Sequence, residues 1–230
     1  NAEKGLSVSL RGDGGKMQIE IEAKRLALPF AEAIVLNEFS GKGSFGAQEL
    51  TLREFEARAF DGLFTGNARL SWRNDWIFEG EFAARGMDAA KVAGPVLSAG
   101  RLEGKGVFGM RAAEPEKLKA SARLEGSFNV QKGTIGNIDL TRVLQGASGS
   151  GGSTLFSEMT GSVVAGASRI QLRQIRLAAG LLSATGSAEA DAQKNLLGRL
   201  QIELRAQAMQ ARASVAISGT LAEPQFRRSN

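Results

Sequence analysis

Lys117-Leu-Lys-Ala-Ser-Ala-Arg-Leu-Glu-Gly-Ser-Phe-Asn-Val-Gln131 alternates between polar and apolar or small residues along its whole length. Successive side chains of a β-strand point to opposite faces, so this period of two predicts a strand with one polar and one apolar face. Fifteen residues are long for a single strand, and we therefore expect a bend or turn near Gly126.

The same alternation recurs along most of the chain. It is found at 6–11, 17–22, 69–73, 76–82, 101–111, 200–205 and 211–218. Gly12-Asp13-Gly14-Gly15 separates the first two segments and is typical of a hairpin turn, because glycine readily adopts positive φ. Asn74-Asp75 predicts another turn. This spacing predicts on the order of 15 strands.

Helical signals are few. Residues 87–93 predict a short helix before Gly94-Pro95, with Asp88 near its start. Residues 139–145 predict a second one, with Asp139 as N-cap and Gly146 as the stop. Residues 30–35 are ambiguous, and the Gly/Ser-rich residues 146–153 predict a flexible loop.

The composition excludes much enzyme chemistry. The 230 residues contain no Cys, no His and no Tyr, whereas Gly occurs 29 times. Without Cys and His there is no disulfide, no Cys/His zinc site, no haem ligation by His or Cys and no His-activated nucleophile. We therefore expect a non-enzymatic protein with no catalytic residue, no cofactor and no metal site.

Charge and hydropathy limit the classes of partner that this protein is expected to bind. The net charge is +5, with 15 basic and 16 acidic residues in 1–115 but 14 and 8 in 116–230. A basic half can favour anionic lipid headgroups or nucleic acid, or simply solubility. The cations are spread singly without interleaved aromatics, so no nucleic-acid partner is expected. No apolar stretch approaches the roughly 20 residues of a membrane-spanning helix.

Two arrangements can bury the apolar face of such a sheet. The sheet can fold over on itself as a sandwich or closed barrel, or it can curl lengthwise into a trough lined by apolar residues and open to acyl chains. Alternation alone does not separate the two. Many apolar-face positions are small, for example Gly104, Gly106 and Gly126, and small residues leave space for a ligand, a helix or a close backbone.

Several short motifs resemble AsmA-like proteins. Residues 126–140 read as a glycine, a strand, a glycine and a short Ile-Asp-Leu helix, similar to the C-terminal region of that family. Residues 154–161 are similar to its Thr-x-Phe element, and 217–226 resemble its Gly-Thr-Leu-x-x-Pro terminus. Residues 50–64 and 78–90 resemble the repeat that precedes this region.

The resemblance implies a place in the envelope of Gram-negative bacteria. AsmA-like proteins are anchored in the inner membrane by an N-terminal helix and project a groove-forming β-sheet into the periplasm. They are implicated in phospholipid transport and outer-membrane integrity, and they are similar to TamB and other bridge-like lipid carriers. By this resemblance we expect β repeats at 3–115 and 116–230, continuous with each other, in a periplasmic piece whose membrane anchor is missing. Asn1-Ala2 resembles the remnant of a cleaved expression tag.

The sequence thus predicts a mainly β fold: a long, twisted, mostly antiparallel sheet, curled into an elongated trough or open barrel, with two or so short helices. The expected function is a periplasmic, inner-membrane-tethered groove segment for phospholipid or another acyl-chain ligand, with envelope proteins as further partners. The alternative is a self-packed structural module that recruits an envelope-assembly partner through a sheet edge. The candidate groove residues are Phe78, Phe82, Phe108, Met110, Leu124, Phe128, Leu200 and Ile202.

Overall fold

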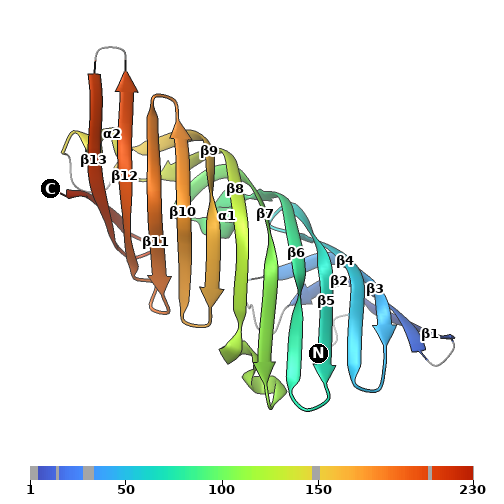
Figure 1. Cartoon of the computed structure of the whole chain (residues 1–230). Helices are drawn as coiled ribbons and strands as arrows, with labels where there is room; N and C mark the ends of the chain where they lie inside the picture. The colour runs from blue at the N-terminus through green and yellow to red at the C-terminus, as the bar shows by residue number, and fades with distance from the viewer. Residues whose placement is uncertain (1–4, 14–15, 28–33, 147–150, 207–208, 230) are drawn as a thin grey trace. The chain divides into compact units, whose positions relative to one another are not determined.

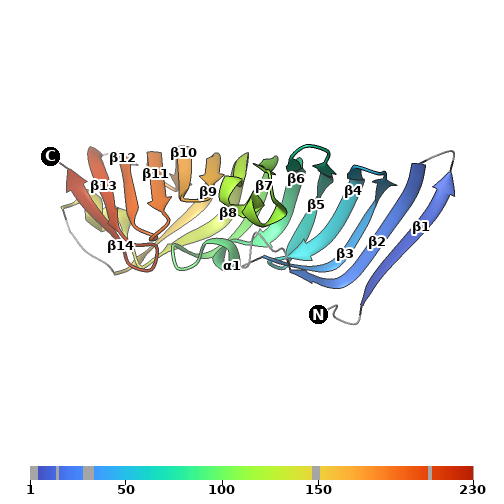
Figure 2. The same cartoon turned by 90° about the horizontal axis from the view of Figure 1, so that it is seen from below.

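The chain forms one antiparallel meander sheet in which every strand pairs with its neighbours in the sequence. A computed structural model describes residues 5–13, 16–27, 34–146, 151–206 and 209–229. Its 14 strands lie in the order of the chain, from β1 to β14 (Figure 1 and Figure 2). The predicted mainly β, antiparallel class is confirmed, and the strand number is close to the expected one.

The elements follow one another with short connections. The strands are β1 (Leu6–Asp13), β2 (Lys16–Ala27), β3 (Val35–Phe45), β4 (Glu49–Ala59), β5 (Gly62–Trp72), β6 (Trp76–Asp88), β7 (Leu97–Ala112), β8 (Arg123–Gly136), β9 (Ser153–Gly166), β10 (Arg169–Ala179), β11 (Leu182–Asp191), β12 (Leu196–Ala206), β13 (Met209–Gly219) and β14 (Pro224–Ser229). The helices are α1 (Ala89–Ala93), α2 (Leu140–Leu144) and the 3-10 helix η1 (Pro115–Ser121).

The segment with the longest alternation does not fold as predicted over its first half. Pro115 opens η1, and β8 begins only at Arg123. Leu118 is half-buried and Ala120 is exposed, so this stretch has little apolar surface to bury as a strand. Ser121 closes the turn, since its hydroxyl donates to the Leu118 carbonyl (2.9 Å) and accepts from the Arg111 amide (2.8 Å).

The predicted bend or turn at Gly126 was also wrong. β8 continues through this residue to Gly136 as one strand. Its irregular residue is Lys132, which has a left-handed φ of 50°. The strand therefore has an irregular residue at Lys132 and no turn at Gly126.

Both predicted α-helices are confirmed, together with their caps. The Asp88 carboxylate accepts from the Ala90 amide (2.9 Å) at the start of α1. The Asp139 carboxylate accepts from the Thr141 and Arg142 amides (2.9 and 3.2 Å) at the start of α2. An N-cap carboxylate satisfies amides that have no partner within the helix.

Some predictions lie outside the described residues, wholly or in part. These are Asn1-Ala2, the tip of the Gly12–Gly15 turn, most of residues 30–35 and the centre of the Gly/Ser-rich loop at 146–153. Where the structure describes the flanks, β1 ends at Asp13, β3 begins at Val35 and β9 begins at Ser153.

The sheet is open. β1 pairs with β2 and β14 pairs with β13, so the sheet begins and ends on strands that have one neighbour each. The closed barrel, one form of the self-buried alternative, was therefore wrong. A meander of consecutive antiparallel pairs has two free edges unless its end strands meet.

The chain comprises two compact units, and each is described by itself. Unit 1 consists of residues 1–87 and 105–125, and unit 2 of residues 88–104 and 126–230. The core of unit 2 gathers buried side chains from β8 and β9, from β10 to β14 and from α2. Its largest fully buried side chains are those of Val130, Ile138, Leu140, Ile202 and Val215.

Helix α2 is fixed to the sheet of unit 2 by polar contacts as well as by its apolar side chains. The buried Thr154 hydroxyl on β9 accepts from the Leu140 amide (2.9 Å) and donates to the Ile138 carbonyl (2.8 Å). At the other end, the Arg228 guanidinium on β14 donates to the Leu144 carbonyl (3.2 Å). These bonds hold the helix over the apolar side of unit 2 and satisfy its terminal backbone groups.

Candidate functional site

The strand register of unit 1 places apolar residues on one face from β1 to β6. Residues directly opposite in an antiparallel pair share a face, so each pair extends the set by one strand. The ladder runs from Val8 to Ile21, from Ile21 to Gly41 and from Gly41 to Phe55, and it continues from Phe55 to Gly66 and on to Phe82. We call this side the apolar face of unit 1.

A bulge in β4 keeps its apolar residues on that face. The register with β5 shifts between Leu52 and Phe55, where Leu52 pairs with Ala68 and Phe55 pairs with Gly66. Ala68 and Gly66 are two apart and share a face, so Leu52 and Phe55 share it too, although they are three apart. The alternation therefore changes phase within the strand.

Aromatic rings form a row across the apolar face of unit 1. The aromatic row consists of Phe39, Phe55, Phe64 and Phe82, one from each strand of β3 to β6. Its successive ring centroids are 6.1, 5.6 and 5.6 Å apart. These distances lie in the range of favourable aromatic pairs, each of which contributes about 0.5–1.5 kcal/mol beyond area burial.

A second aromatic group lies on the same face, nearer the β5–β6 turn. Trp72 and Trp76 are direct cross-strand partners and their rings stack at 5.9 Å. Phe45 lies 6.0 Å from Trp72, and Phe78 lies 5.0 Å from Phe108. The face therefore carries aromatic surface toward both ends of its strands.

The small residues of this face do not leave empty space at the positions beside these rings. A Cβ atom on Gly66 would lie 2.9 Å from the Phe55 ring, and one on Gly80 would lie 2.8 Å from the Phe108 ring. The rings thus lie over the glycines of a neighbouring strand. The nearest atom to either Cβ is a backbone oxygen of the neighbouring strand, that of Glu81 or Asn67. At these positions glycine therefore accommodates a close backbone and an aromatic ring and does not leave space for a ligand.

The apolar face is exposed at its N-terminal edge. Leu6, Val8 and Leu10 on β1 are 55, 51 and 49% exposed, and Met17 and Phe45 are 39 and 37% exposed. The only helix among the described residues of unit 1 is η1, and none of its residues is buried. Large apolar side chains gathered on one exposed face typically mark a binding surface.

Unit 2 differs, because α2 packs on its apolar side against β9, β12, β13 and β14. Leu200 and Ile202 lie in the core that includes α2, and Ile202 is only 1% exposed. In this part of the chain the apolar side chains are buried within the unit itself. Acyl chains would have to displace α2 to reach them.

The eight predicted groove residues separate into these two environments. Phe78, Phe82, Phe108 and Leu124 belong to unit 1 and are half-buried, and Met110 of the same unit is buried. Phe128 belongs to unit 2, where its ring lies over Gly161, whose Cβ would be 2.7 Å away. Of the set, Phe78, Phe82 and Phe108 are the residues that the structure gathers with the aromatic surface of unit 1.

The opposite face of unit 1 is polar and carries exposed ion pairs. Arg69 contacts Glu49 (3.1 Å) and Glu79 (3.8 Å), and Arg58 contacts Glu38 (2.9 Å). Such exposed pairs contribute little to stability. They show that this side of the sheet faces water.

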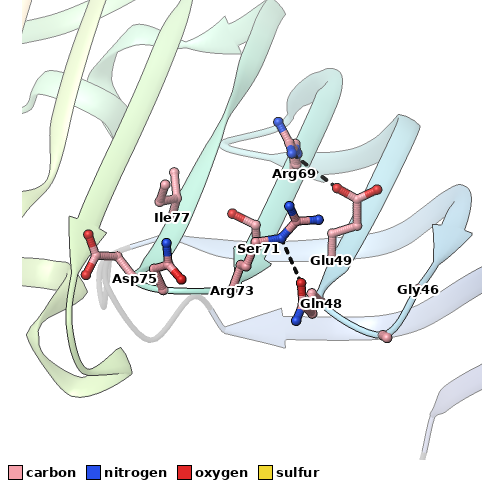
Figure 3. A pocket seen from close by; sticks show the side chains of 10 residues that line it. Gly46, Gln48, Glu49, Arg69, Ser71, Arg73, Asp75 and Ile77 are labelled. Carbon is pink, nitrogen blue, oxygen red and sulfur yellow. Dashed lines mark hydrogen bonds and ion pairs between the residues drawn. The ribbon is translucent and has the colours of Figure 1, made fainter.

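A shallow hollow of about 480 Å³ lies on the polar face, where β3–β4 and β5–β6 connect (Figure 3). Its cations already have partners: Arg69 pairs with Glu49, and Arg73 donates to the Gln48 side chain at 2.7 Å. Asp75 pairs with Arg111 at 2.7 Å. Arg73 keeps its positive charge, because the Gln48 amide is neutral, but the hollow is shallow and lies on the water-facing side of the sheet, and we do not assign it a function.

The polar side of unit 2 holds one strongly perturbed carboxylate. The pKa of Glu203 on β12 is lowered to about 2, chiefly by hydrogen bonds from Arg205 and then from Arg212 and Gln210. The Arg205 and Arg212 contacts are 2.9 and 2.8 Å long. This carboxylate stays ionised at neutral pH and links β12 to β13 through its hydrogen bonds rather than acting as an acid or base.

Among the residues that the structure describes, no group of three or more Asp or Glu side chains is arranged to hold a metal ion. Within the same ranges, no helix has the length and apolar character needed to cross a membrane.

Comparison with known proteins gave no match: no family model, no curated protein and no solved structure is similar to this chain at a significant level. The resemblance to AsmA-like proteins therefore stays a prediction. The apolar face of unit 1 is the feature of the structure that bears on function.

Sequence reasoning missed several residues of that face. Phe39, Phe55 and Phe64 complete the aromatic row, and the exposed Val8 and Met17 lie on the same side of the sheet. The signal for Val8 and Met17 was present in the alternation of the first hairpin. Phe55 had no such signal, since the bulge in β4 reverses the phase before it.

Proposed function

We propose that the apolar face of unit 1 binds the acyl chains of lipids, and that the protein is a periplasmic groove segment of an inner-membrane-anchored carrier. Its task would be phospholipid transport in outer-membrane biogenesis or integrity. The observation that supports this proposal is the apolar face of unit 1, which is exposed on β1 and at Met17 of β2 and continues into the aromatic row. Within that row Phe64 and Phe82 are half-buried, whereas Phe39 and Phe55 are buried. The motifs that resemble AsmA-like proteins provide the envelope context.

The physical basis is transfer of hydrocarbon from water to an apolar surface. Each methylene removed from water contributes about 0.8 kcal/mol, so ten would contribute about 8 kcal/mol before the entropic costs of binding. Acyl chains would lie across the exposed apolar side chains of β1 and the half-buried rings of Phe64 and Phe82, and the headgroups would remain in water. The curled trough or open barrel predicted from the sequence was wrong, because the sheet is neither closed nor strongly curled. The proposed binding surface is the apolar face of unit 1 itself.

The self-packed alternative has support in unit 2 alone. There α2 packs on the apolar side of the sheet, and Thr154 and Arg228 fix it by hydrogen bonds. This unit would then stabilise the chain or present it to an envelope partner. The two roles are compatible, since each belongs to a different unit.

Lipid extraction and mass spectrometry of the purified chain test the proposal. Phe64→Glu places a charge in the centre of the aromatic row and should lower co-purified phospholipid at least fivefold. The matched control is Thr65→Glu, the next residue of β5, which points to the polar face and should leave lipid content unchanged. Unchanged lipid in folded Phe64→Glu, or no lipid in the parent chain after incubation with phospholipid vesicles, would refute the proposal.

A second variant covers the risk that Phe64→Glu fails to fold. Met17 is already 39% exposed on β2, so Met17→Glu should fold normally while it adds a charge to the apolar face. Its control is Gln18→Glu on the opposite face of the same strand. Circular dichroism should give superimposable spectra for the two variants, and only Met17→Glu should lose lipid.

A further inference from the structure

The outer edge of β1 carries a row of backbone groups with no partner among the described residues. β1 and β2 pair without a register shift from Leu6–Ala23 to the turn, and the Lys24 amide donates to the Gly5 carbonyl (3.2 Å). In an antiparallel ladder, hydrogen-bonded pairs alternate with pairs whose backbone groups point away. The N–H and C=O groups of Leu6, Val8 and Leu10 therefore point outward from the sheet.

The two end strands of the sheet differ in how they are protected. β14 has six residues, begins with Pro224 and carries Arg227 and Arg228, which are features that discourage pairing with another strand. β1 has eight residues, and from Leu6 to Leu10 it contains neither a charge nor a proline. Its outward backbone groups belong to the same residues as its exposed apolar side chains.

The sequence of this edge is self-complementary. Leu6-Ser7-Val8-Ser9-Leu10 reads the same in both directions. Two copies paired antiparallel about Val8 would set Leu6 opposite Leu10, Ser7 opposite Ser9, and Val8 opposite Val8. In this register the outward-pointing residues of one copy meet those of the other, whereas a shift by one residue would oppose outward and inward groups.

Side-chain chemistry agrees with the same register. The apolar residues all lie on one face, so Leu and Val side chains of the two copies pair with one another. The serines pair on the other face. Arg11 would lie opposite Gly5, so no like charges meet between residues 5 and 11.

We propose that β1 is a homodimer interface, in which a second copy of this chain adds its own β1 antiparallel across a twofold axis at Val8. Such an isologous contact uses the same residues of both copies. It would form about six backbone hydrogen bonds. An interface of this size predicts a weak, reversible dimer. This inference does not depend on the proposed lipid function.

Sedimentation velocity of the purified chain, from low micromolar to several hundred micromolar, tests the proposal. The weight-average mass should rise from 24.3 kDa toward twice that value. Val8→Lys sets two cations against each other on the axis and should remain monomeric over the whole range. Val8 is about half exposed, so this substitution should not disturb the fold.

Charge reversal identifies the twofold pairing. Val8→Lys mixed with Val8→Glu should restore the dimer, with an apparent association at least tenfold stronger than that of either variant alone, because only in this register do the two positions meet. Met17→Glu, which changes the apolar face but not the edge, should dimerise like the parent chain.

Three outcomes would overturn the inference: a parent chain that stays monomeric, a dimer that survives Val8→Lys, or a mixture that fails to associate. A dimer lost in Met17→Glu would show association through the apolar faces instead. Because these readouts do not involve lipid, their failure leaves the lipid experiment as an independent result.

Discussion

Replacing Gly133 by alanine should destabilise unit 2 when the Phe156 ring is present and stabilise it when the ring is absent. A Cβ atom on Gly133 would overlap the Phe156 ring, and its three nearest atoms all belong to that ring. Phe156 is only 4% exposed and lies in the core of unit 2, so the ring cannot swing into solvent. Overpacking of this kind costs about 1–3 kcal/mol.

Removing the ring should reverse this effect. Phe156→Ala by itself should cost about 3–5 kcal/mol, as is usual for truncation of a buried phenylalanine. With the ring absent, the three atoms nearest to the new Cβ are gone, and Gly133→Ala should gain about 0.5–1 kcal/mol from the loss of glycine's unfolded-state freedom. Gly133 does not have a left-handed φ, so its backbone accepts alanine. The coupling free energy is therefore about 1.5–4 kcal/mol.

The measurement is a double-mutant cycle from urea unfolding followed by far-UV circular dichroism. Gly109→Ala is the matched control, because a Cβ on this strand glycine would meet no atom within 4 Å and should be neutral or slightly stabilising. The reasoning is refuted if Gly133→Ala costs the same free energy with and without the Phe156 ring. A changed urea slope would show that the denatured state, and not the packing, had changed.

Two further predictions concern unit 2. Thr154→Val should cost about 1–3 kcal/mol, because it leaves the Leu140 amide and the Ile138 carbonyl without their buried partner; urea midpoints measure this, and Thr154→Ser should restore most of the loss. The lowered pKa of Glu203 should stabilise the fold fully above its ordinary value of 4.5, and this contribution should be lost as the pH falls to about 2. Unfolding of Glu203→Gln should therefore converge with that of the parent chain in this pH range, and a carboxyl titration midpoint near 4.5 by NMR would contradict the assignment.

The sequence predicted the strands well wherever two physical conditions held together. Alternating residues must include side chains large enough to gain from burial, and the segment must end at residues that turn. Both hold for the pair β5 and β6, whose tryptophans flank the Asn74-Asp75 turn. Only the first condition failed at residues 117–121, where the apolar positions are one leucine and one alanine, and a 3-10 helix formed instead.

The bulges could not be predicted, and the one in β4 explains why Phe55 was missed. In β10 the register shifts between Leu172 and Ile175, and Gln174 within this step has a φ of 52°. A left-handed glutamine gives no sequence signal, since glycine or asparagine is the usual residue there. After each bulge the apolar face continues on residues of the opposite parity, so counting every second residue assigns Phe55 to the wrong side.

The sequence also did not reveal that α2 packs on the apolar side of unit 2. The Asp139 cap predicts α2, but five helical residues do not reveal which strands they will lie on. Thr154 fixes the helix through two backbone bonds to residues 14 and 16 positions earlier in the chain. Local patterns therefore predicted the helix, and only the tertiary structure showed that it buries Leu200 and Ile202.

The pairing of every strand with its sequence neighbours also determines how the sheet can assemble. In the sheet of the described residues, no strand pairs with one that is distant in the sequence. The loops that must close are therefore short, and the entropic cost of forming each strand pair is small. Hairpins can form independently and then extend the sheet by one strand at a time, as in repeat proteins whose modules contact only their neighbours. A chain built in this way can fold progressively from one end during synthesis, and fraying of an end strand leaves the other strand pairs in place.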